Sequence, residues 1–152
     1  MDLIFEKIKI ISGGQTGVDR AALDFAIQHK LHYGGWCTNG RLAEDGIINM
    51  KYNLIETNTK LFIHRTYLNV RDTDATLLIF QDELDEGSEL TELFCLHLSK
   101  PYRLFNLKNF NAHTILQWFK KNNFKSINFA GPRESNSPGI YTKTIEALIQ
   151  LK

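Results

Sequence analysis

The sequence has 152 residues, of which 43% are hydrophobic and 23% are charged, and this is enough chain for one domain with its own buried core. The composition is typical of a soluble globular protein and excludes a disordered one. A formal net charge of +1 excludes a general electrostatic preference for nucleic acid or for an anionic membrane, so any anion site must be local. We predict a single ligand-binding domain over residues 1–152.

The cysteines and the apolar runs indicate the compartment. Cys37 and Cys95 are too few for a disulfide framework, and neither belongs to a Cys/Cys or Cys/His pattern that would bind zinc. The amino terminus lacks the long apolar core of a signal peptide, and no run of about 18 apolar residues could span a bilayer. We therefore predict a cytoplasmic protein without a membrane partner. No metal site is expected, because the histidines are scattered: they are His29, His32, His64, His97 and His113.

The segment Ile8–Arg20, IKIISGGQTGVDR, predicts a short buried strand, a glycine turn and the start of a helix. Glycines let a ligand approach the main chain, and free N–H groups at the helix start, helped by the helix dipole, form a site for an anion, most often a phosphate. Thr16 or Ser12 could add a hydroxyl donor, and Arg20 could add a positive charge. The segment matches neither G-x-G-x-x-G nor the P-loop, and a strand-to-helix turn without a ligand would also favour glycine. The candidate ligand-binding residues here are Gly13, Gly14, Gln15, Thr16, Gly17 and Arg20.

After the first helix, Leu31–Tyr33 predicts a short strand, and the residues that follow it predict a long loop. Long loops in compact domains are often functional, because a rigid scaffold can present them over a site. Trp36 could stack on a ligand ring, and Arg41 could reach a phosphate or a carboxylate. The other interpretation is that Trp36 packs the loop onto the domain and Arg41 pairs with Glu44 or Asp45; the spacing does not choose between the two.

The rest of the chain alternates between strand and helix patterns. Residues 47–59 have no clear period, and the polar stretch 65–71 predicts either a second helix start or a surface turn. Ala75–Phe80, ATLLIF, is the clearest buried strand, because it is a continuous apolar run. Gly87 and Ser88 precede a helical pattern, with Ser88 as the expected N-cap. The other predicted elements are a strand at Pro101–Leu107, a helix at Ala112–Asn122, a strand at Ser126–Gly131 and a closing helix at Ile140–Lys152.

This alternation predicts a three-layer α/β domain with a mainly parallel sheet and helices on both faces. In such sheets ligands bind outside the carboxyl ends of the strands. That rule gathers four loops around one crevice, namely Gly13–Gly17, Trp36–Gly46, Gly87–Thr91 and Gly131–Gly139. The candidate ligand-binding residues of the later loops are Trp36, Arg41, Gly87, Ser88, Thr91, Gly131 and Arg133.

Five separated motifs occur in order along the chain: SGGQTGVDRAALD from Ser12, GRLAEDG from Gly40, RTYLNVRDTDATL from Arg65, GSELT from Gly87 and AGPRESNSPGI from Ala130. In these motifs the chain resembles the putative molybdenum carrier family, over residues 9–148. That family is a branch of the Rossmann-like group that also contains the lysine-decarboxylase-like nucleotide hydrolases, called LOG proteins, and the DNA-processing protein DprA.

The resemblance implies a Rossmann-like domain, commonly a homo-oligomer, whose glycine loops hold the phosphate end of a nucleotide-like ligand or of molybdenum cofactor. GGQTG would be the first phosphate-binding loop and GSELT the second. The second loop departs from the family's glycine-glycine-threonine pattern, because Glu86 stands where the first glycine is expected and Ser88 where the threonine is. The acidic residues beside Ser88 would repel a phosphate unless a cation intervenes.

Three functions remain open at this point. The first is binding of a phosphorylated pterin or nucleotide, which needs donors and shape but no chemistry. The second is hydrolysis of a nucleotide's N-glycosidic bond, with Glu92 as the acid/base or ribose-binding group and Arg71 or Arg133 as its charge partner. The third is a nucleotide sensor that acts through a partner protein. A nucleic-acid role is not expected, because the sequence has no basic stripe.

Overall fold

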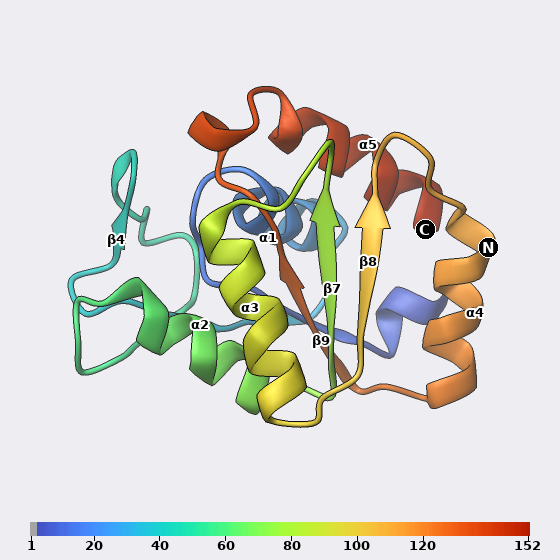
Figure 1. The fold of residues 1–152 in the computed structure, drawn as a ribbon, viewed down its shortest axis with the longest axis horizontal. Coiled ribbons are helices and arrows are strands. Elements are labelled where there is room, and N and C mark those ends of the chain that lie inside the picture. The colour runs from blue at the N-terminus through green and yellow to red at the C-terminus, as the bar shows by residue number, and fades with distance from the viewer. Residues whose placement is uncertain (1–2) are drawn as a thin grey trace.

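The computed structural model describes residues 3–152. Its centre is a sheet of five parallel strands in the order β2-β1-β9-β7-β8 (Figure 1). The first five residues of β7 are all buried, as expected for an apolar strand that is covered on both faces. The strands of this sheet are β1 Lys9–Ile11, β2 Tyr33–Gly34, β7 Ala75–Phe80, β8 Tyr102–Asn106 and β9 Ser126–Ala130.

Helices cover both faces of the sheet. α1, α4 and α5 share one apolar cluster with the short 3-10 helix η1, whereas α2 and α3 pack together on the other face (Figure 1). This arrangement confirms the predicted α/β class. Within the described residues, no helix has both the length and the apolar composition needed to cross a membrane. The helices are η1 Leu3–Glu6, α1 Val18–Gln28, α2 Phe62–Arg71, α3 Glu86–His97, α4 Ala112–Asn122, η2 Glu134–Asn136 and α5 Ile140–Leu151.

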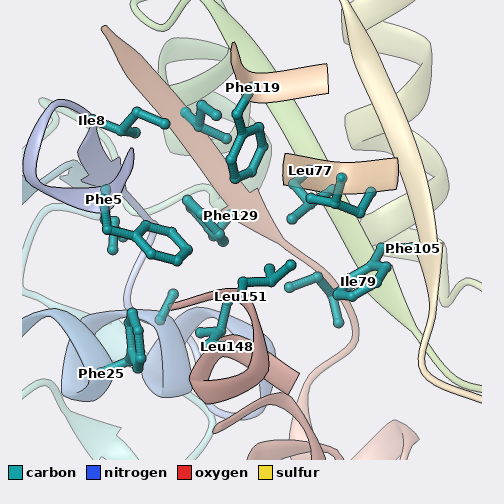
Figure 2. Packing of buried hydrophobic residues seen from close by; sticks show 14 of the residues in the cluster. Phe5, Ile8, Phe25, Leu77, Ile79, Phe105, Phe119, Phe129, Leu148 and Leu151 are labelled. Atoms are coloured by element: carbon teal, nitrogen blue, oxygen red, sulfur yellow. The ribbon is translucent and has the colours of Figure 1, made fainter. Parts of the chain in front are cut away.

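The main core lies between the sheet and the α1, α4 and α5 layer (Figure 2). Phe5 of η1 is 2% exposed and packs edge-on against Phe25 of α1 and Phe119 of α4, with ring centres 5.4 and 6.2 Å apart. Leu77 and Ile79 of β7 complete this side of the cluster. The segment before β1, for which the sequence predicted no element, therefore contributes an aromatic side chain to the core.

The region between α1 and α2 has a small core of its own. Besides β2, it contains four short strands: β3 pairs with β6 in parallel, and β4 pairs with β5 as an antiparallel hairpin. Ile48, Tyr52 and Leu54 are buried there beside Leu23 of α1. Their irregular spacing explains why residues 47–59 gave no prediction. The strands are β3 Trp36–Cys37, β4 Leu42–Ala43, β5 Gly46–Ile47 and β6 Ile55–Glu56.

Two local predictions were wrong, and one open question is settled. The strand expected at Leu31–Tyr33 begins only at Tyr33. The Leu31 N–H instead donates to the main-chain oxygen of Ala26 in the last turn of α1. Ser88 is not the N-cap of α3; Asp85 is, and its carboxylate accepts from the Ser88 N–H. The polar stretch 65–71 forms the body of α2 and is not a turn.

The strand order determines where the loops meet. β2 lies outside β1 at one edge and β8 lies outside β7 at the other, while β9 lies between β1 and β7. The connection from β1 to β2 therefore runs toward one edge of the sheet, and the connection from β7 to β8 runs toward the other, so the direction reverses at the centre. Such a reversal is the usual place for a ligand in open α/β sheets, and here the loops after β1, β7 and β9 meet at it.

Candidate ligand-binding site

A cavity of about 90 Å³ lies at the carboxyl ends of β1, β7 and β9, with α2 as an additional wall. This is several times the roughly 10–15 Å³ that one water needs. Gly131 is required here, because a Cβ at this position would lie 2.1 Å from the main-chain oxygen of Ile79. The predicted residues that line the cavity are Gly13, Gln15, Gly87, Thr91, Gly131 and Arg133.

Several main-chain donors of the first glycine loop are paired within the protein. The Gly14 N–H donates to Ser12 Oγ and the Gln15 N–H to Asp19 Oδ2, both at 3.3 Å. The Val18 N–H, at the start of α1, donates to the oxygen of Pro132. A Cβ on Gly17 would lie 2.3 Å from that oxygen, so the β9 loop covers this end of the helix. The amides of Gly14, Gln15 and Val18, which the sequence predicted to be free for an anion, are therefore occupied by groups of the chain itself.

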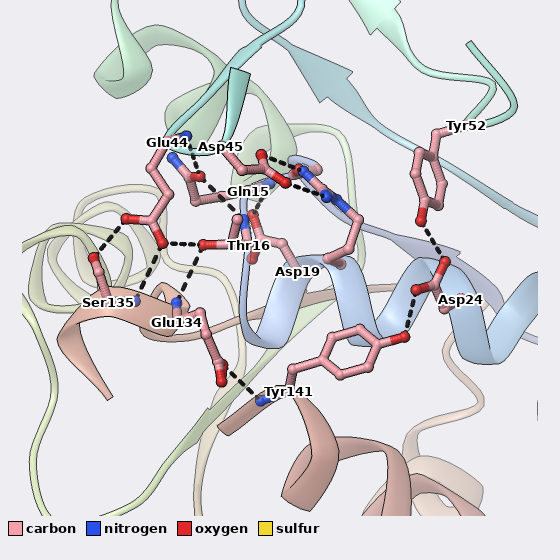
Figure 3. Close-up of polar contacts among 12 residues, drawn as sticks. Gln15, Thr16, Asp19, Asp24, Glu44, Asp45, Tyr52, Glu134, Ser135 and Tyr141 are labelled. Atoms are coloured by element: carbon pink, nitrogen blue, oxygen red, sulfur yellow. Dashed lines mark hydrogen bonds and ion pairs between the residues drawn. The ribbon is translucent and has the colours of Figure 1, made fainter. Parts of the chain in front are cut away.

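The two side chains expected to assist an anion at this loop already hold carboxylates (Figure 3). Thr16 Oγ1 donates to Glu44, and Arg20 donates to both oxygens of Asp45 at 3.0 and 3.2 Å. Burial alone would lower the pKa of Arg20, but the hydrogen bonds and charge of Asp45 raise it overall. The loop 36–46 therefore contacts the first glycine loop through Glu44 and Asp45 at the tip of its hairpin. The anions bound by Thr16 and Arg20 are side chains of the protein itself.

Asp85 caps the start of α3 and lines one wall of the cavity. Its carboxylate accepts from Ser88 N and Oγ at 2.9 and 2.6 Å, from Asn136 Nδ2 at 3.0 Å and from the Arg133 N–H at 3.3 Å. Burial would raise the pKa of Asp85, but these hydrogen bonds keep it below its ordinary value. A permanent negative charge therefore lies at the second glycine loop, as the acidic sequence around Gly87 suggested.

Arg65 of α2 is the cation of the cavity wall. Its NH1 donates to Thr66 Oγ1 at 2.9 Å, whereas its buried Nε has no partner within residues 3–152. Among those residues no carboxylate forms an ion pair with it within 4.0 Å. Burial lowers the pKa of Arg65, the charge of Asp19 opposes that shift, and the charge of Arg133 adds to it. Arg65 as a residue is half-buried, but a guanidinium with a buried Nε and no ion-pair partner is unusual in a folded protein, because charge burial is costly.

Asp19 is the buried carboxyl of the cavity wall. It is 5% exposed, and it lies in the first turn of α1. Burial raises the pKa of Asp19 to about 6, although the charge of Arg65 and the hydrogen bond from the Gln15 N–H favour the ionised form. Asp85 adds to the upward shift. The cavity thus contains a carboxyl that gains or loses a proton close to neutral pH.

Gln15 presents a second unpaired donor. Its Oε1 accepts from the main-chain N–H groups of Thr16 at 3.0 Å and Glu44 at 2.9 Å. Two N–H donors need an acceptor, so this pairing fixes which end of the amide is oxygen. The other end, Nε2, is buried and has no hydrogen-bond partner in the described part of the chain. The Gln15 side chain therefore has donor capacity to spare on the cavity wall.

The two candidates from loop 36–46 lie outside the cavity. Trp36 packs this loop onto α2: its Nε1 donates to Asp72 at 2.9 Å, and its main-chain N–H donates to Asn69 at 2.8 Å. Arg41 is 7% exposed, does not line the cavity and pairs with no carboxylate among residues 3–152. It donates instead to the main-chain oxygens of Ile48, Asn49 and Tyr52, so it fixes the base of the β4–β5 hairpin.

The catalytic candidates are separated in space. Arg133 lines the cavity, but Arg71 lies at the last residue of α2, where it pairs with Asp72 at 2.7 Å. Glu92 is not part of the cavity wall; it lies near Tyr102 of β8, where burial and then the Glu92 carboxylate raise the pKa of the tyrosine. The geometry thus brings none of the proposed Glu92–arginine pairs together at the cavity.

The sequence did not single out several residues that line the cavity. Asp19 and Arg65 both belong to the motifs quoted above, but only the folded chain places them on one wall. Both helices carry other charged residues, Arg20 and Asp24 in α1 and Arg71 in α2, so no local signal separates Asp19 and Arg65 from them. The lining residues that were not predicted are Asp19, Phe62, Ile63, Arg65, Thr66, Asn69, Asp85, Leu90, Asn128 and Ala130.

Comparisons with known proteins agree with the motifs. A family model described as the circularly permutated YpsA SLOG family matches residues 10–152. A crystal structure of a putative molybdenum carrier protein from Syntrophus aciditrophicus SB is 43% identical, with a TM-score of 0.89, over 94% of this chain and 93% of that one. Comparison with curated proteins gives no significant match. The predicted resemblance is confirmed, and the chain belongs to the circularly permutated YpsA SLOG family.

Proposed function

We propose that this chain binds a small phosphate-bearing ligand, of the molybdenum cofactor or nucleotide type, in the cavity between β1, β7 and β9. The observation that carries the proposal is Arg65, whose buried Nε lacks a partner and which forms no ion pair among residues 3–152. A phosphate at this wall would supply the missing anion, and the spare donor of Gln15 would add a hydrogen bond. Arg133 provides a second cation on the same cavity.

Molybdenum cofactor fits this donor set through its phosphate. Arg65, Arg133 and the Gln15 amide would hold that group. Residues 3–152 contain no group of three His, Cys, Asp or Glu side chains placed to hold a metal ion, so the metal would remain on the pterin that carries it. When bound, the cofactor would supply a redox-active molybdenum; the contribution of this chain is to bind and shield it. The similar protein from Syntrophus aciditrophicus is described as a putative molybdenum carrier, which favours this ligand over a plain nucleotide.

One observation favours a second candidate, hydrolysis of a nucleotide's N-glycosidic bond. A carboxyl whose pKa lies near the working pH can act as a general acid or base, and burial raises the pKa of Asp19 to about 6. Asp19 lines the cavity, whereas Glu92 does not. If AMP is cleaved to adenine and ribose phosphate, Asp19→Asn should abolish the activity and Glu92→Gln should leave most of it. Equal effects of the two substitutions would exclude this assignment of roles.

Urea unfolding in the presence of inorganic phosphate tests the binding proposal. A ligand that binds only the folded state stabilises it by about 1.4 kcal/mol at ten times its Kd. We expect this gain for the wild type and for Arg71→Met, a matched control on the same helix, and no gain for Arg65→Met. If all three proteins gain equally from phosphate, Arg65 does not hold the anion and the proposal is wrong.

A further inference from the structure

Glu44 and Asp45 form the tip of the β4–β5 hairpin, which stands away from the central sheet (Figure 1). The base of the hairpin is fixed, because the buried Arg41 donates to main-chain oxygens of the following segment. The hairpin itself has few apolar contacts, and Ile47 of β5 is 76% exposed. The polar contacts of Glu44 and Asp45 are therefore the main interactions that hold the hairpin tip against the rest of the protein.

The Glu44 carboxylate is held by donors of the kind that bind phosphate (Figure 3). Thr16 Oγ1 and the Ser135 N–H donate to one oxygen, and Ser135 Oγ donates to the other at 2.5 Å. Arg133 NH1 lies 3.8 Å from the second oxygen. Burial would raise the pKa of Glu44, but these contacts keep it below its ordinary value, so the group is an anion at neutral pH.

A second internal anion lies next to the first. Asp45 accepts two hydrogen bonds from the Arg20 guanidinium, at 3.0 and 3.2 Å. Arg20 also donates to the main-chain oxygen of Gly14, so it remains fixed at the first glycine loop when Asp45 is removed. Two carboxylates on consecutive residues thus occupy neighbouring sets of donors at the carboxyl ends of β1 and β9.

Gln15 connects this anion pair with the cavity. It is 6% exposed, it lines the cavity, and its Oε1 accepts from the Glu44 N–H. Its Nε2 is buried and, among residues 3–152, has no hydrogen-bond partner. An unpaired donor at this junction indicates that an acceptor is missing between the hairpin tip and the cavity.

We propose that Glu44 and Asp45 occupy a second anion subsite beside the cavity, and that a ligand with a diphosphate group displaces them. This inference rests on the proposed function, because the first phosphate of such a ligand would lie at Arg65. Arg133 lines the cavity and also faces Glu44, so two phosphates joined by one oxygen would share it. The hairpin tip then competes with a diphosphate ligand but not with a single phosphate.

The test uses inorganic phosphate and inorganic pyrophosphate as probes. Each is titrated calorimetrically into the full-length wild type, Glu44→Gln and the control Glu146→Gln, at one ionic strength. Glu146 is exposed on α5, so the control removes the same charge far from the crevice. We expect Glu44→Gln to bind pyrophosphate about ten-fold more tightly than the wild type, because the competing anion is gone, and phosphate with little change. Asp45→Asn should act in the same direction.

Unchanged pyrophosphate affinity in Glu44→Gln, or a parallel loss of both probes, would overturn the inference and make the hairpin contact purely structural. Urea unfolding of each variant shows that the fold is retained, and a glutamine oxygen can still accept from Ser135. Failure of the proposed function gives a different result: phosphate then binds the wild type and Arg65→Met equally, or binds neither. The inference is tested by comparing the pyrophosphate affinity of Glu44→Gln with that of the wild type. Equal affinities overturn the inference whether or not Arg65 binds phosphate.

Discussion

Arg65 and Arg133 share one aromatic ring: their guanidinium carbons lie 5.5 and 5.6 Å from the centre of the Phe62 ring. The two cations come from α2 and from the loop after β9, and both line the cavity. Attraction to the ring offsets part of the repulsion between like charges. Phe62 therefore positions both arginines at the entrance of the proposed phosphate site.

Replacing this ring should weaken phosphate binding without unfolding the protein. Phe62 is 36% exposed, so Phe62→Leu removes little core packing. A cation–π contact at a partly exposed site contributes about 0.5–1 kcal/mol, so loss of two contacts predicts a roughly 5- to 30-fold weaker phosphate affinity by calorimetry. Leu61→Ala, at a neighbouring residue that is 63% exposed, is the control and should bind phosphate normally. Normal binding by Phe62→Leu would show that the ring does not position the arginines.

Asp19→Asn should make the protein more stable at neutral pH but not at pH 4. Folding raises the pKa of Asp19 from its ordinary value of 3.8 to about 6, so the folded protein holds this proton more tightly than the unfolded chain. The stability that depends on this proton is present below about pH 4 and is lost as the pH rises through about 6. A pKa difference of about two units corresponds to roughly 3 kcal/mol. This is the upper limit that we expect for the gain in unfolding free energy of Asp19→Asn above about pH 7.

Urea unfolding at pH 4, 5, 6 and 7.5 measures this difference. Asp82→Asn is a suitable control, because Asp82 is exposed and pairs only with the exposed Lys108 among the residues that the structure describes. A constant difference between Asp19→Asn and the wild type across this pH range would contradict the account of Asp19. A rising difference would show that the charge of this carboxyl opposes folding and is kept for binding or catalysis.

Gly131→Ala should destabilise the fold, whereas Gly87→Ala should not. A Cβ on Gly131 would meet the oxygen of Ile79 at 2.1 Å and the Val18 side chain at 2.6 Å, so β7 or α1 must shift. We expect a loss of roughly 2–4 kcal/mol in urea unfolding. On Gly87 the nearest atom would be 3.9 Å away, and alanine in a helix should add up to about 1 kcal/mol. Similar stabilities of the two variants would contradict the close packing described at β9.

The sequence predicted the fold class, and it proposed a site where the loops after the strands meet; both follow from local patterns and one topological rule. Ala75–Phe80 and Ala112–Asn122 coincide with β7 and α4, since an unbroken apolar run and an amphipathic helix are strong signals. The four expected loops also meet at one end of the sheet. Arg65 was missed as a site residue, because the stretch that contains it reads equally well as a helix or a surface turn.

Partners distant in sequence could not be predicted. Thr16 and Arg20 were expected to face an anion, and they do, but the anions are Glu44 and Asp45, more than 20 positions away. The sequence left open whether Arg41 reaches a ligand or pairs with Glu44 or Asp45; in the structure Arg41 does neither and donates to three main-chain oxygens of the following segment. A local pattern cannot show which of two arginines a carboxylate will pair with, because Arg20 lies 25 positions from Asp45 in the sequence.

Native mass spectrometry of the freshly purified full-length chain tests the central claim most directly. The wild type, the Arg65→Met variant and the Arg71→Met control are compared before and after incubation with an extract of small metabolites, and released molecules are identified by ultraviolet spectra and analysed for molybdenum and phosphorus. We predict a phosphorus-containing pterin or nucleotide on the wild type and on Arg71→Met, and none on Arg65→Met. The same bound molecules on all three proteins, or none on any of them after incubation, would contradict a phosphate site at Arg65.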